Sequence, residues 1–438
     1  MLWKGEQWVL GYVLGLTLFT FLVFIAHIVT GMPLSRLGFL GVCFAALVVL
    51  GVLWRARLSG HRAPPEPPVP AGASSSLVRW SLVAFGAWIA LRTIIFTALL
   101  FLTPSFFDDT MDNWNLRGKL FFVDREFTLI FPWDQNAQGV SSYPPSVSLA
   151  KTWFAALAGQ WSDGLANGIH ILWFLALLLL VYWTLRRMLP LAWSILGALM
   201  LASLPLEFIQ GTGTYADIFL SVHLLAAVAM MLHALTSHTR DHARSWLRLG
   251  AFAIALVPFT KNEGFALYFP VLLLLYAGTL LWLTKKKMLS GRDLGTMLLI
   301  AAVGIAAIAL PWIGFKIAHG LSFGNAKGID FQFRWQPGVL QAVLVNTFLE
   351  GNWNFLFPLF FGLLALQWRA VLRPPLLLLA AFFMIPYLGQ MFFYLFTGLG
   401  QEALFQTGYA RGLIHLMPGI VTLTVLLLHD VLRKDTRT

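Results

Sequence analysis

The sequence predicts an all-α, polytopic membrane protein with about 12 membrane-spanning helices (range about 10–13) and an external loop that carries interfacial helices. Three observations predict this class. Hydrophobic residues form 58% of the 438-residue chain, charged residues form only 11%, and the mean hydropathy is +0.76. Soluble domains contain about a quarter charged residues, whereas a spanning helix needs about 20 mostly apolar residues. The composition therefore excludes an ordinary soluble protein.

Long apolar runs place the spans along the chain. We expect them near residues 8–29, 37–54, 81–103, 165–185, 190–209, 215–235, 249–260, 264–283, 295–316, 352–368, 374–396 and 411–432. The seventh and eighth runs are separated only by Lys261, Asn262 and Glu263, so they are two spans or one broken span. No small-residue cleavage site follows the first run, so we expect it to stay as an uncleaved span.

Composition divides the chain into three expected regions. Residues 1–54 form a two-helix membrane appendage. Residues 55–80 form a basic, proline-rich cytoplasmic linker that cannot build a core. Residues 81–438 form the transmembrane main body, with external loops at 104–164 and 317–350.

The basic residues predict the orientation of the chain. With the 55–80 linker in the cytoplasm, 19 of the 30 lysines and arginines fall on the cytoplasmic side, as the positive-inside rule requires. Both termini are then cytoplasmic, and the loop at 104–147 is external. This asymmetry accounts for the formal charge of +11 without nucleic acid as a partner. The single Cys43 excludes an internal disulfide and a thiolate metal site.

The segment at 104–147 is the strongest candidate for a functional site. It holds six of the chain's 19 carboxylates, namely Asp108, Asp109, Asp112, Asp124, Glu126 and Asp134. Carboxylates beside an apolar boundary are costly and usually mark a site. Trp114, Leu116 or Arg117, Leu120 and Phe121 follow at helical spacing, which predicts an amphipathic interfacial helix. Arg117 and Lys119 would then flank the same surface as the aspartates. A tuned carboxylate can act as a general base. A solvated acidic loop under such a helix is the structural alternative.

Two further motifs follow the acidic segment. Tyr143 precedes Pro144-Pro145 and either ends the loop or lines a site. Glu207, Tyr215 and Asp217 lie around the outer end of a hairpin. Asp217 begins an apolar helix, so its carboxylate either caps that helix or belongs to a site.

Two late motifs place cations at the same face. Lys261 and Glu263 interrupt an apolar stretch, where charged groups need partners or water; a plain Lys–Glu pair in an outer loop is the alternative. Arg411 and His415 are four residues apart and share a helix face. An arginine there could bind a phosphate, although a lone buried histidine is more often a packing residue. No nucleotide-binding loop, zinc motif or nucleophile elbow is present.

Together these motifs resemble those of the GT-C membrane glycosyltransferases, specifically the protein-mannosyltransferase-like and lipid A aminoarabinose-transferase-like branch. The most specific match is Asp109-x-x-x-x-Trp114-x-x-Arg117-x-Lys119. Further matches follow in chain order at Tyr143-Pro144-Pro145, Tyr215-Ala216-Asp217, Thr260-Lys261-Asn262-Glu263-Gly264 and Arg411-Gly412-Leu413-Ile414-His415-Leu416-Met417-Pro418. Asp108-Asp109 stands where Asp-Glu is common in the mannosyltransferases, and Ala410 stands where an acid often precedes the late arginine.

The resemblance implies a GT-C-like fold and the transfer, with inversion, of a sugar from a polyprenyl-phosphate donor to an acceptor hydroxyl. It implies that Asp109, or its neighbour Asp108, is the general base. The residues it implies for the donor phosphate are Lys261, Arg411, Arg117, Lys119 and His415. The residues it implies around the substrate are Asp112, Trp114, Tyr143, Tyr215, Asp217 and Glu263.

The same resemblance implies the partners and the location. No metal site or cofactor is required, although Asp108 and Asp112 leave room for a divalent cation. The partners are the lipid-linked donor, membrane lipids and an acceptor glycan, lipid or protein. The expected location is a bacterial inner (plasma) membrane, with the site facing the exterior.

Two other functions stay open on the sequence. A transporter or flippase of an anionic polyprenyl-linked lipid would use the same cations, but it should carry charges along a pathway through the membrane midplane. An O-antigen ligase or polymerase would be expected to carry its dominant external loop late in the chain, whereas the acidic loop here is early.

Overall fold

The computed structural model describes residues 2–57, 75–106, 108–129, 140–323 and 333–435. Most of the expected 55–80 linker, and part of both external loops, lie outside these residues. The helices are α1 (Lys4–Thr30), α2 (Arg36–Arg57), α3 (Ser76–Leu102), α4 (Asn115–Asp124), α5 (Ser146–Ala158), α6 (Asp163–Arg186), α7 (Leu191–Ser203), α8 (Pro205–Thr212), α9 (Asp217–Thr236), α10 (Arg240–Leu256), α11 (Phe269–Lys285), α12 (Gly291–Ala318), α13 (Val339–Phe348), α14 (Leu356–Leu366), α15 (Trp368–Val371), α16 (Leu376–Phe396), α17 (Gly400–Leu404), α18 (Gly408–Ile414) and α19 (Met417–Asp435). No strand occurs in the described ranges.

The predicted all-α membrane fold is confirmed, with fewer spans than the 12 expected. Eight helices of the described chain are long and apolar enough to cross a membrane, or up to ten if the bent pairs α7–α8 and α18–α19 each count as one span. The expected span at 249–260 belongs to α10, whose first half carries Arg240, Arg244 and Arg248. The expected span at 352–368 contains α14, whose 11 residues cover about 16 Å, half of a bilayer core.

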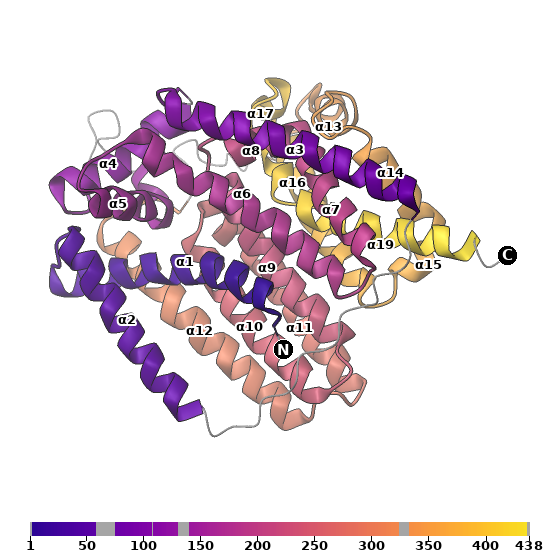
Figure 1. Cartoon of the computed structure of the whole chain (residues 1–438), viewed down its shortest axis with the longest axis horizontal. Helices are drawn as coiled ribbons and strands as arrows, with labels where there is room; N and C mark the ends of the chain where they lie inside the picture. The colour runs from indigo at the N-terminus through magenta and orange to yellow at the C-terminus, as the bar shows by residue number, and fades with distance from the viewer. Residues whose placement is uncertain (1, 58–74, 107, 130–139, 324–332, 436–438) are drawn as a thin grey trace.

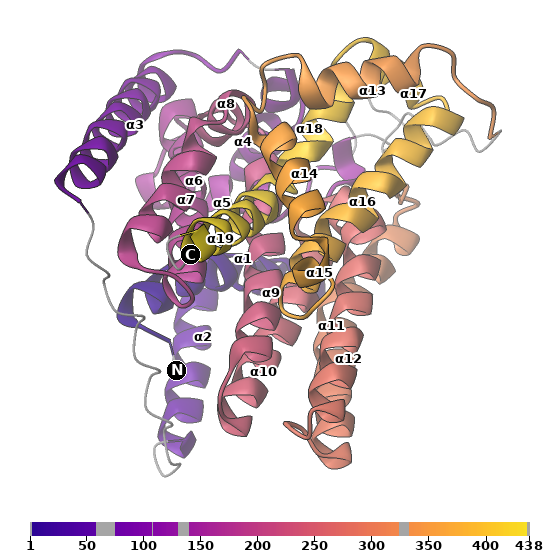
Figure 2. The ribbon, with the colours of Figure 1, turned by 90° about the vertical axis from the view of Figure 1, so that its right-hand side faces the viewer.

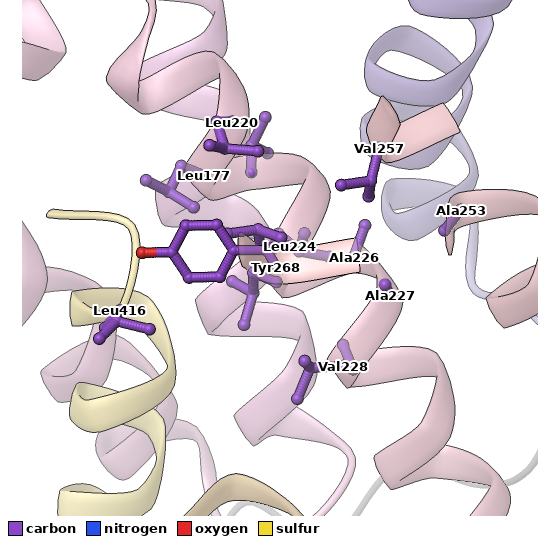
Figure 3. Close-up of a cluster of buried hydrophobic side chains, with 14 of the residues drawn as sticks. Leu177, Leu220, Leu224, Ala226, Ala227, Val228, Ala253, Val257, Tyr268 and Leu416 are labelled. Carbon is purple, nitrogen blue, oxygen red and sulfur yellow. The ribbon is translucent and has the colours of Figure 1, made fainter. Parts of the chain in front are cut away.

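Helix α9 lies at the centre of the bundle (Figure 1). Its sequence is apolar on every side, which is typical of a helix that is buried all round, and α6, α10 and α11 pack against it. Leu220, Leu224 and Val228 of α9 lie among side chains from α6, α10 and the π-helical turn Gly264–Tyr268 that precedes α11 (Figure 3). The N-terminus of this rigid helix carries Asp217, so the carboxylate is placed by the core itself.

Helix α1 packs inside the body, although the sequence analysis placed it in a peripheral appendage. Thr17 Oγ1 lies 2.8 Å from His223 Nε2 of α9, and Glu6 pairs with Arg187 at the end of α6. Phe24 packs against aromatic rings that follow α10 and line α12. Helix α2, in contrast, buries little of its surface and contacts α1 and α5. Residues 1–54 therefore do not pack as one unit.

The described part of the loop at 104–164, which was predicted to be external, folds into short helices. Residues Thr110–Trp114 form a π-helical turn that continues into α4, and α4 packs against α5 (Figure 1). A side chain at Gly118 would lie 3.2 Å from the Ser148 carbonyl oxygen, so glycine permits this close crossing. The predicted helix in this segment is confirmed, and its close packing against α5 orients the loop that precedes it.

The bent helix pairs and short helices gather at one end of the bundle. In Figure 2, α8, α13, α17 and α18 lie together at the upper end, and α18 contacts α13, α17 and the start of α9. Of the charged motifs predicted as external, Glu207 lies on α8 and Arg411 on α18, whereas Asp217 begins α9 and Lys261 and Glu263 lie at the turn before α11.

Candidate active site

The buried carboxylate of Asp217 is the centre of the candidate site. The residue is 1% exposed and accepts hydrogen bonds from three cationic or imidazole groups. Its Oδ1 lies 2.6 Å from Lys261 Nζ and 3.0 Å from His415 Nε2, and its Oδ2 lies 3.2 Å from Arg411 Nη2. A carboxylate only accepts, so the Nε2 of His415 carries the proton. Asp217 thus gathers the site's basic groups rather than merely capping α9.

Two breaks between helices bring these groups to Asp217. Lys261 follows the 3-10 turn Val257–Phe259 and precedes the π-helical turn Gly264–Tyr268. A side chain at Gly264 would lie 2.9 Å from the Val257 carbonyl oxygen, so only glycine allows this tight break. Arg411 and His415 lie at the bend of 55° between α18 and α19. The shared helix face expected for them is what lets both reach Asp217.

Arg411 connects this buried group to the acidic loop. Its Nη2 lies 2.6 Å from Asp109 Oδ2, and its Cζ lies 4.4 Å from the centre of the Tyr215 ring. The Tyr215 hydroxyl donates to Asp108 Oδ1 at 2.6 Å, and Thr110 is hydrogen-bonded to Thr214. The loop acids therefore dock onto the segment between α8 and α9.

The two loop aspartates have different environments. The hydrogen bonds from Tyr215 and from the backbone of Asp109 hold the pKa of Asp108 below its usual value. Asp109 bonds to a guanidinium, and its side chain is 39% exposed. Of the two carboxylates, Asp109 is thus the one that contacts the cationic cluster, whereas Asp108 is the more exposed residue.

Lys261 stays charged in spite of its burial. Burial alone lowers the pKa of the amine, but the charges of Asp217 and Glu263 outweigh it and raise the pKa above its usual value. Glu263 Oε1 lies 3.4 Å from Lys261 Nζ. The side chain of Lys261 therefore presents a permanent positive charge beside Arg411.

A second layer of side chains holds His415. The Tyr268 hydroxyl lies 3.3 Å from His415 Nδ1 and accepts a hydrogen bond from Gln390 Nε2 at 2.9 Å. Sequence reasoning missed Tyr268 and Gln390, because single polar residues inside apolar helices give no signal of their partners. Their position fixes the ring of His415 toward Asp217.

The remaining candidates of the acidic loop do not join the Asp217 cluster. Trp114 is buried and packs edge-on against Tyr143, with ring centres 5.3 Å apart. Arg117 is buried and donates from Nη2 to the Tyr143 carbonyl oxygen at 3.0 Å; burial lowers its pKa to about 9. Asp112 and Lys119 are exposed. The sequence analysis put Arg117 and Lys119 on one surface with the aspartates, whereas the helix turns them to different sides.

The carboxylates of the site form hydrogen bonds with basic side chains and hydroxyl groups. Asp108 bonds to Tyr215, Asp109 to Arg411, and Asp217 to three donors. Within the described ranges, no group of three or more His, Cys, Asp or Glu side chains is arranged to hold a metal ion. The described geometry thus fits the binding of an anion between Lys261 and Arg411 and a proton transfer at Asp109.

Comparison with solved structures identifies the fold. ArnT from Cupriavidus metallidurans in the apo state, a GT-C glycosyltransferase, matches with a TM-score of 0.56 and 16% identity over 81% of this chain and 60% of ArnT. The structure of the same ArnT bound to undecaprenyl phosphate matches with a TM-score of 0.56 and 17% identity, over 81% and 61% of the two chains. This chain therefore spans about three fifths of ArnT. No family model and no curated protein matches. The likeness confirms the expected GT-C fold.

Proposed function

We propose that this protein is a membrane glycosyltransferase that moves a sugar from a polyprenyl-phosphate donor to an acceptor hydroxyl. The observation that carries the proposal is the bond of Arg411 to both Asp109 and Asp217. It places an exposed carboxylate beside a compact cationic group within a GT-C fold. A related fold bound to undecaprenyl phosphate supports the choice of donor class.

The geometry supports a direct displacement. Arg411 and Lys261 would hold the carrier phosphate and stabilise the charge that develops on it as it leaves. Asp109 would accept the proton of the acceptor hydroxyl. The acceptor oxygen forms a bond to the anomeric carbon while the bond from that carbon to the phosphate oxygen breaks, so the configuration inverts. The proton ends on Asp109, and the polyprenyl phosphate leaves as the dianion.

Donor binding would also release the base. Without a donor, Arg411 is shared between Asp109 and Asp217, and Lys261 is paired with Asp217 and Glu263. A phosphate that takes over the outer side of Arg411 frees Asp109 from its ion pair. The Asp109 carboxylate then becomes available to the acceptor hydroxyl only when a donor is bound. This order would limit unproductive binding of the acceptor.

We also propose the orientation that the basic residues predict. Asp217 begins α9, whereas Arg240 and Arg244 follow its other end at the start of α10, so the arginines and the site lie at opposite ends of the bundle. The positive-inside rule then puts the site outside the cytoplasmic membrane and both termini in the cytoplasm. Because the charges of the site gather at one end of the described bundle, a transferase is favoured over a transporter.

The test uses the purified full chain in lipid nanodiscs. Polyprenyl-phosphate sugars are added with a membrane-lipid extract, and the release of free polyprenyl phosphate is measured. We expect release by the wild type and by Glu126→Gln, an exposed acid of the same loop, and no release by Asp109→Asn. Near-wild-type release by Asp109→Asn would remove Asp109 from the role of base. Tight donor binding without turnover by the wild type would instead support the lipid transporter.

A further inference from the structure

Two buried cations near the site have no acidic partner. Arg117 of α4 and Lys316 of α12 are each 2% exposed. No carboxylate of the described chain lies within ion-pair distance of either, whereas Lys261 and Arg411 pair with acids. An uncompensated buried charge is strongly unfavourable, so a pair of them in one region requires an explanation.

Arg117 has donors that nothing in the described chain satisfies. Its Nη2 donates to the Tyr143 carbonyl oxygen, and its guanidinium lies 5.7 Å from the Phe121 ring. Its Nε and Nη1 are buried and have no hydrogen-bond partner. A buried guanidinium without acceptors is rare, because each orphaned donor loses its hydration. The free donors of Arg117 therefore indicate a missing acceptor.

Lys316 is held only by neutral groups. Its Nζ donates to the Ser322 carbonyl oxygen at 2.7 Å and to Asn262 Oδ1 at 3.3 Å. The rings of Trp312 and Phe323 lie 5.3 and 5.2 Å from the amine. An ammonium has three donors, and these contacts orient the group without neutralising its charge.

The two cations face one polar wall. Asn262 Nδ2 donates to Ser142 Oγ at 3.3 Å, while Arg117 bonds to the next residue, Tyr143. Lys316 Nζ donates to Asn262 Oδ1, so hydrogen bonds connect both cations to the adjacent residues Ser142 and Tyr143. Asn262 directly follows Lys261, whose side chain turns to Asp217 instead. The Lys261–Arg411 cluster is therefore neutralised by acids, whereas the pair of Arg117 and Lys316 is not. Both lie beside the break between α10 and α11.

We propose that Arg117 and Lys316 form a second oxyanion subsite, which binds a phosphate group of the substrate next to the Lys261–Arg411 cluster. Arginine and lysine together are suited to phosphate, because guanidinium supplies directional donors and ammonium supplies a point charge. The assignment to a substrate rests on the proposed transferase function, whereas the binding of phosphate does not. The phosphate belongs either to a diphosphate-linked donor or to the head group of an anionic acceptor.

The first experiment measures thermal unfolding of the full chain in nanodiscs of zwitterionic lipid. Sodium phosphate is compared with sodium chloride at equal ionic strength. We expect phosphate to raise the Tm of the wild type by about 3 °C, and to raise that of Arg125→Met, an exposed arginine just past α4, equally. The rise should be smaller in Arg117→Met and in Lys316→Met, and the part that remains reports phosphate at the Lys261–Arg411 cluster.

The Tm without phosphate separates a binding role from a structural one. Arg117→Met removes an unneutralised charge and keeps the apolar stem, so its Tm in chloride should equal or exceed that of the wild type. A fall of several degrees in chloride would overturn the proposal, because it would make Arg117 a packing residue. A phosphate response of Arg117→Met as large as that of the wild type would overturn it as well.

The second experiment identifies the source of the phosphate. Binding of short-chain polyprenyl phosphate and polyprenyl diphosphate is compared in wild type and Arg117→Met. A loss of about tenfold for the diphosphate alone assigns the subsite to the donor. Unchanged affinity for both lipids, with a raised KM for a phosphorylated acceptor, assigns it to the acceptor. If no donor is turned over, the transferase proposal fails. The phosphate subsite at Arg117 is tested separately, by the effect of phosphate on the Tm of the wild type and of Arg117→Met.

Discussion

Arg411 Nη2 lies 2.6 Å from Asp109 Oδ2 and links the acidic loop to the last span of the chain. Both side chains of this pair are about one third exposed, at 30% and 39%. An exposed ion pair contributes only about 0–1 kcal/mol to stability, so an incoming phosphate can replace it. The pair of Lys261 with Asp217, in contrast, is 6% and 1% exposed and should persist through catalysis.

The two loop aspartates should differ in their effect on transfer. Asp109→Asn removes the carboxylate next to Arg411 and should lower kcat by about 10²–10⁴-fold, the usual contribution of a general base. Asp108→Asn leaves the Asp109 carboxylate unchanged and weakens the hydrogen bonds that Asp108 accepts from Tyr215 and the Asp109 backbone, so kcat should fall by about tenfold or less. Initial rates of polyprenyl-phosphate release check both. Equal losses in the two variants would show that neither aspartate acts alone as the base.

Asp217→Asn should destabilise the whole bundle. The change leaves Lys261, Arg411 and His415 around a neutral amide in a buried site, and breaking a buried ion pair costs about 3–5 kcal/mol. Thermal unfolding in nanodiscs should therefore show a clear drop in Tm, with Glu126→Gln as the matched exposed control. A Tm equal to that of the control would mean that water or lipid neutralises the two cations without Asp217.

Glu6→Gln tests whether α1 is part of the body. Arg187 bonds to both oxygens of Glu6, at 2.6 and 2.5 Å, and lies between the rings of Trp3 and Trp246. The change removes the carboxylate of a buried ion pair, and we expect a loss of about 3–5 kcal/mol. Lys4→Gln, an exposed change in the same turn, is the control for the Tm. Equal shifts in the two variants would support the peripheral appendage expected from the sequence.

Lys151 should make stability depend on pH. Its amine is fully buried and donates to Asn167 Oδ1 at 2.8 Å and to Asn115, and burial lowers its pKa from 10.5 to about 7. Between these values the unfolded chain binds the proton and the folded chain does not, so stability rises with pH from about 7 to 10.5 and is level below 7.

The variant Lys151→Met isolates this contribution. Between pH 7 and 10, the Tm of the wild type should rise more than the Tm of the variant, because only the wild type has the Lys151 amine. The Tm of the variant at pH 7 should be no lower than the Tm of the wild type at pH 10. Tm measured at steps of pH in nanodiscs checks this. Identical pH profiles for variant and wild type would show that Lys151 keeps an ordinary pKa in the folded protein.

Much of the fold could be predicted from local patterns. Apolar runs long enough to cross a membrane correspond to helices in the structure, and the helix expected after Asp108 is present as α4. Two of the expected spans do not form full membrane-spanning helices, for a reason that the apolar runs do not show. The segment at 249–260 is the apolar end of an amphipathic helix, and α14 is too short, because hydropathy averages over a window without marking where a helix begins.

The site was only partly predictable. Charges that interrupt apolar stretches stand out, which is why Asp109, Asp217, Lys261, Arg411 and His415 were all candidates. Tyr268 and Gln390 give no such signal, since hydroxyls and amides are common in spans. The burial of Arg117, and its separation from Lys119, depend on which face of α4 packs against α5.

The sequence by itself determined that this is a membrane-spanning helical protein and which charged residues would gather at one face. That follows because the bilayer admits few charges, so each one that remains is informative. Only the tertiary structure decided that Asp217 binds the three basic groups of the site, that α1 packs against α6 and α9, and that Arg117 and Lys316 are buried. Those facts depend on contacts between residues such as Asp109 and Arg411, 302 positions apart, and no local pattern specifies which distant side chains will meet.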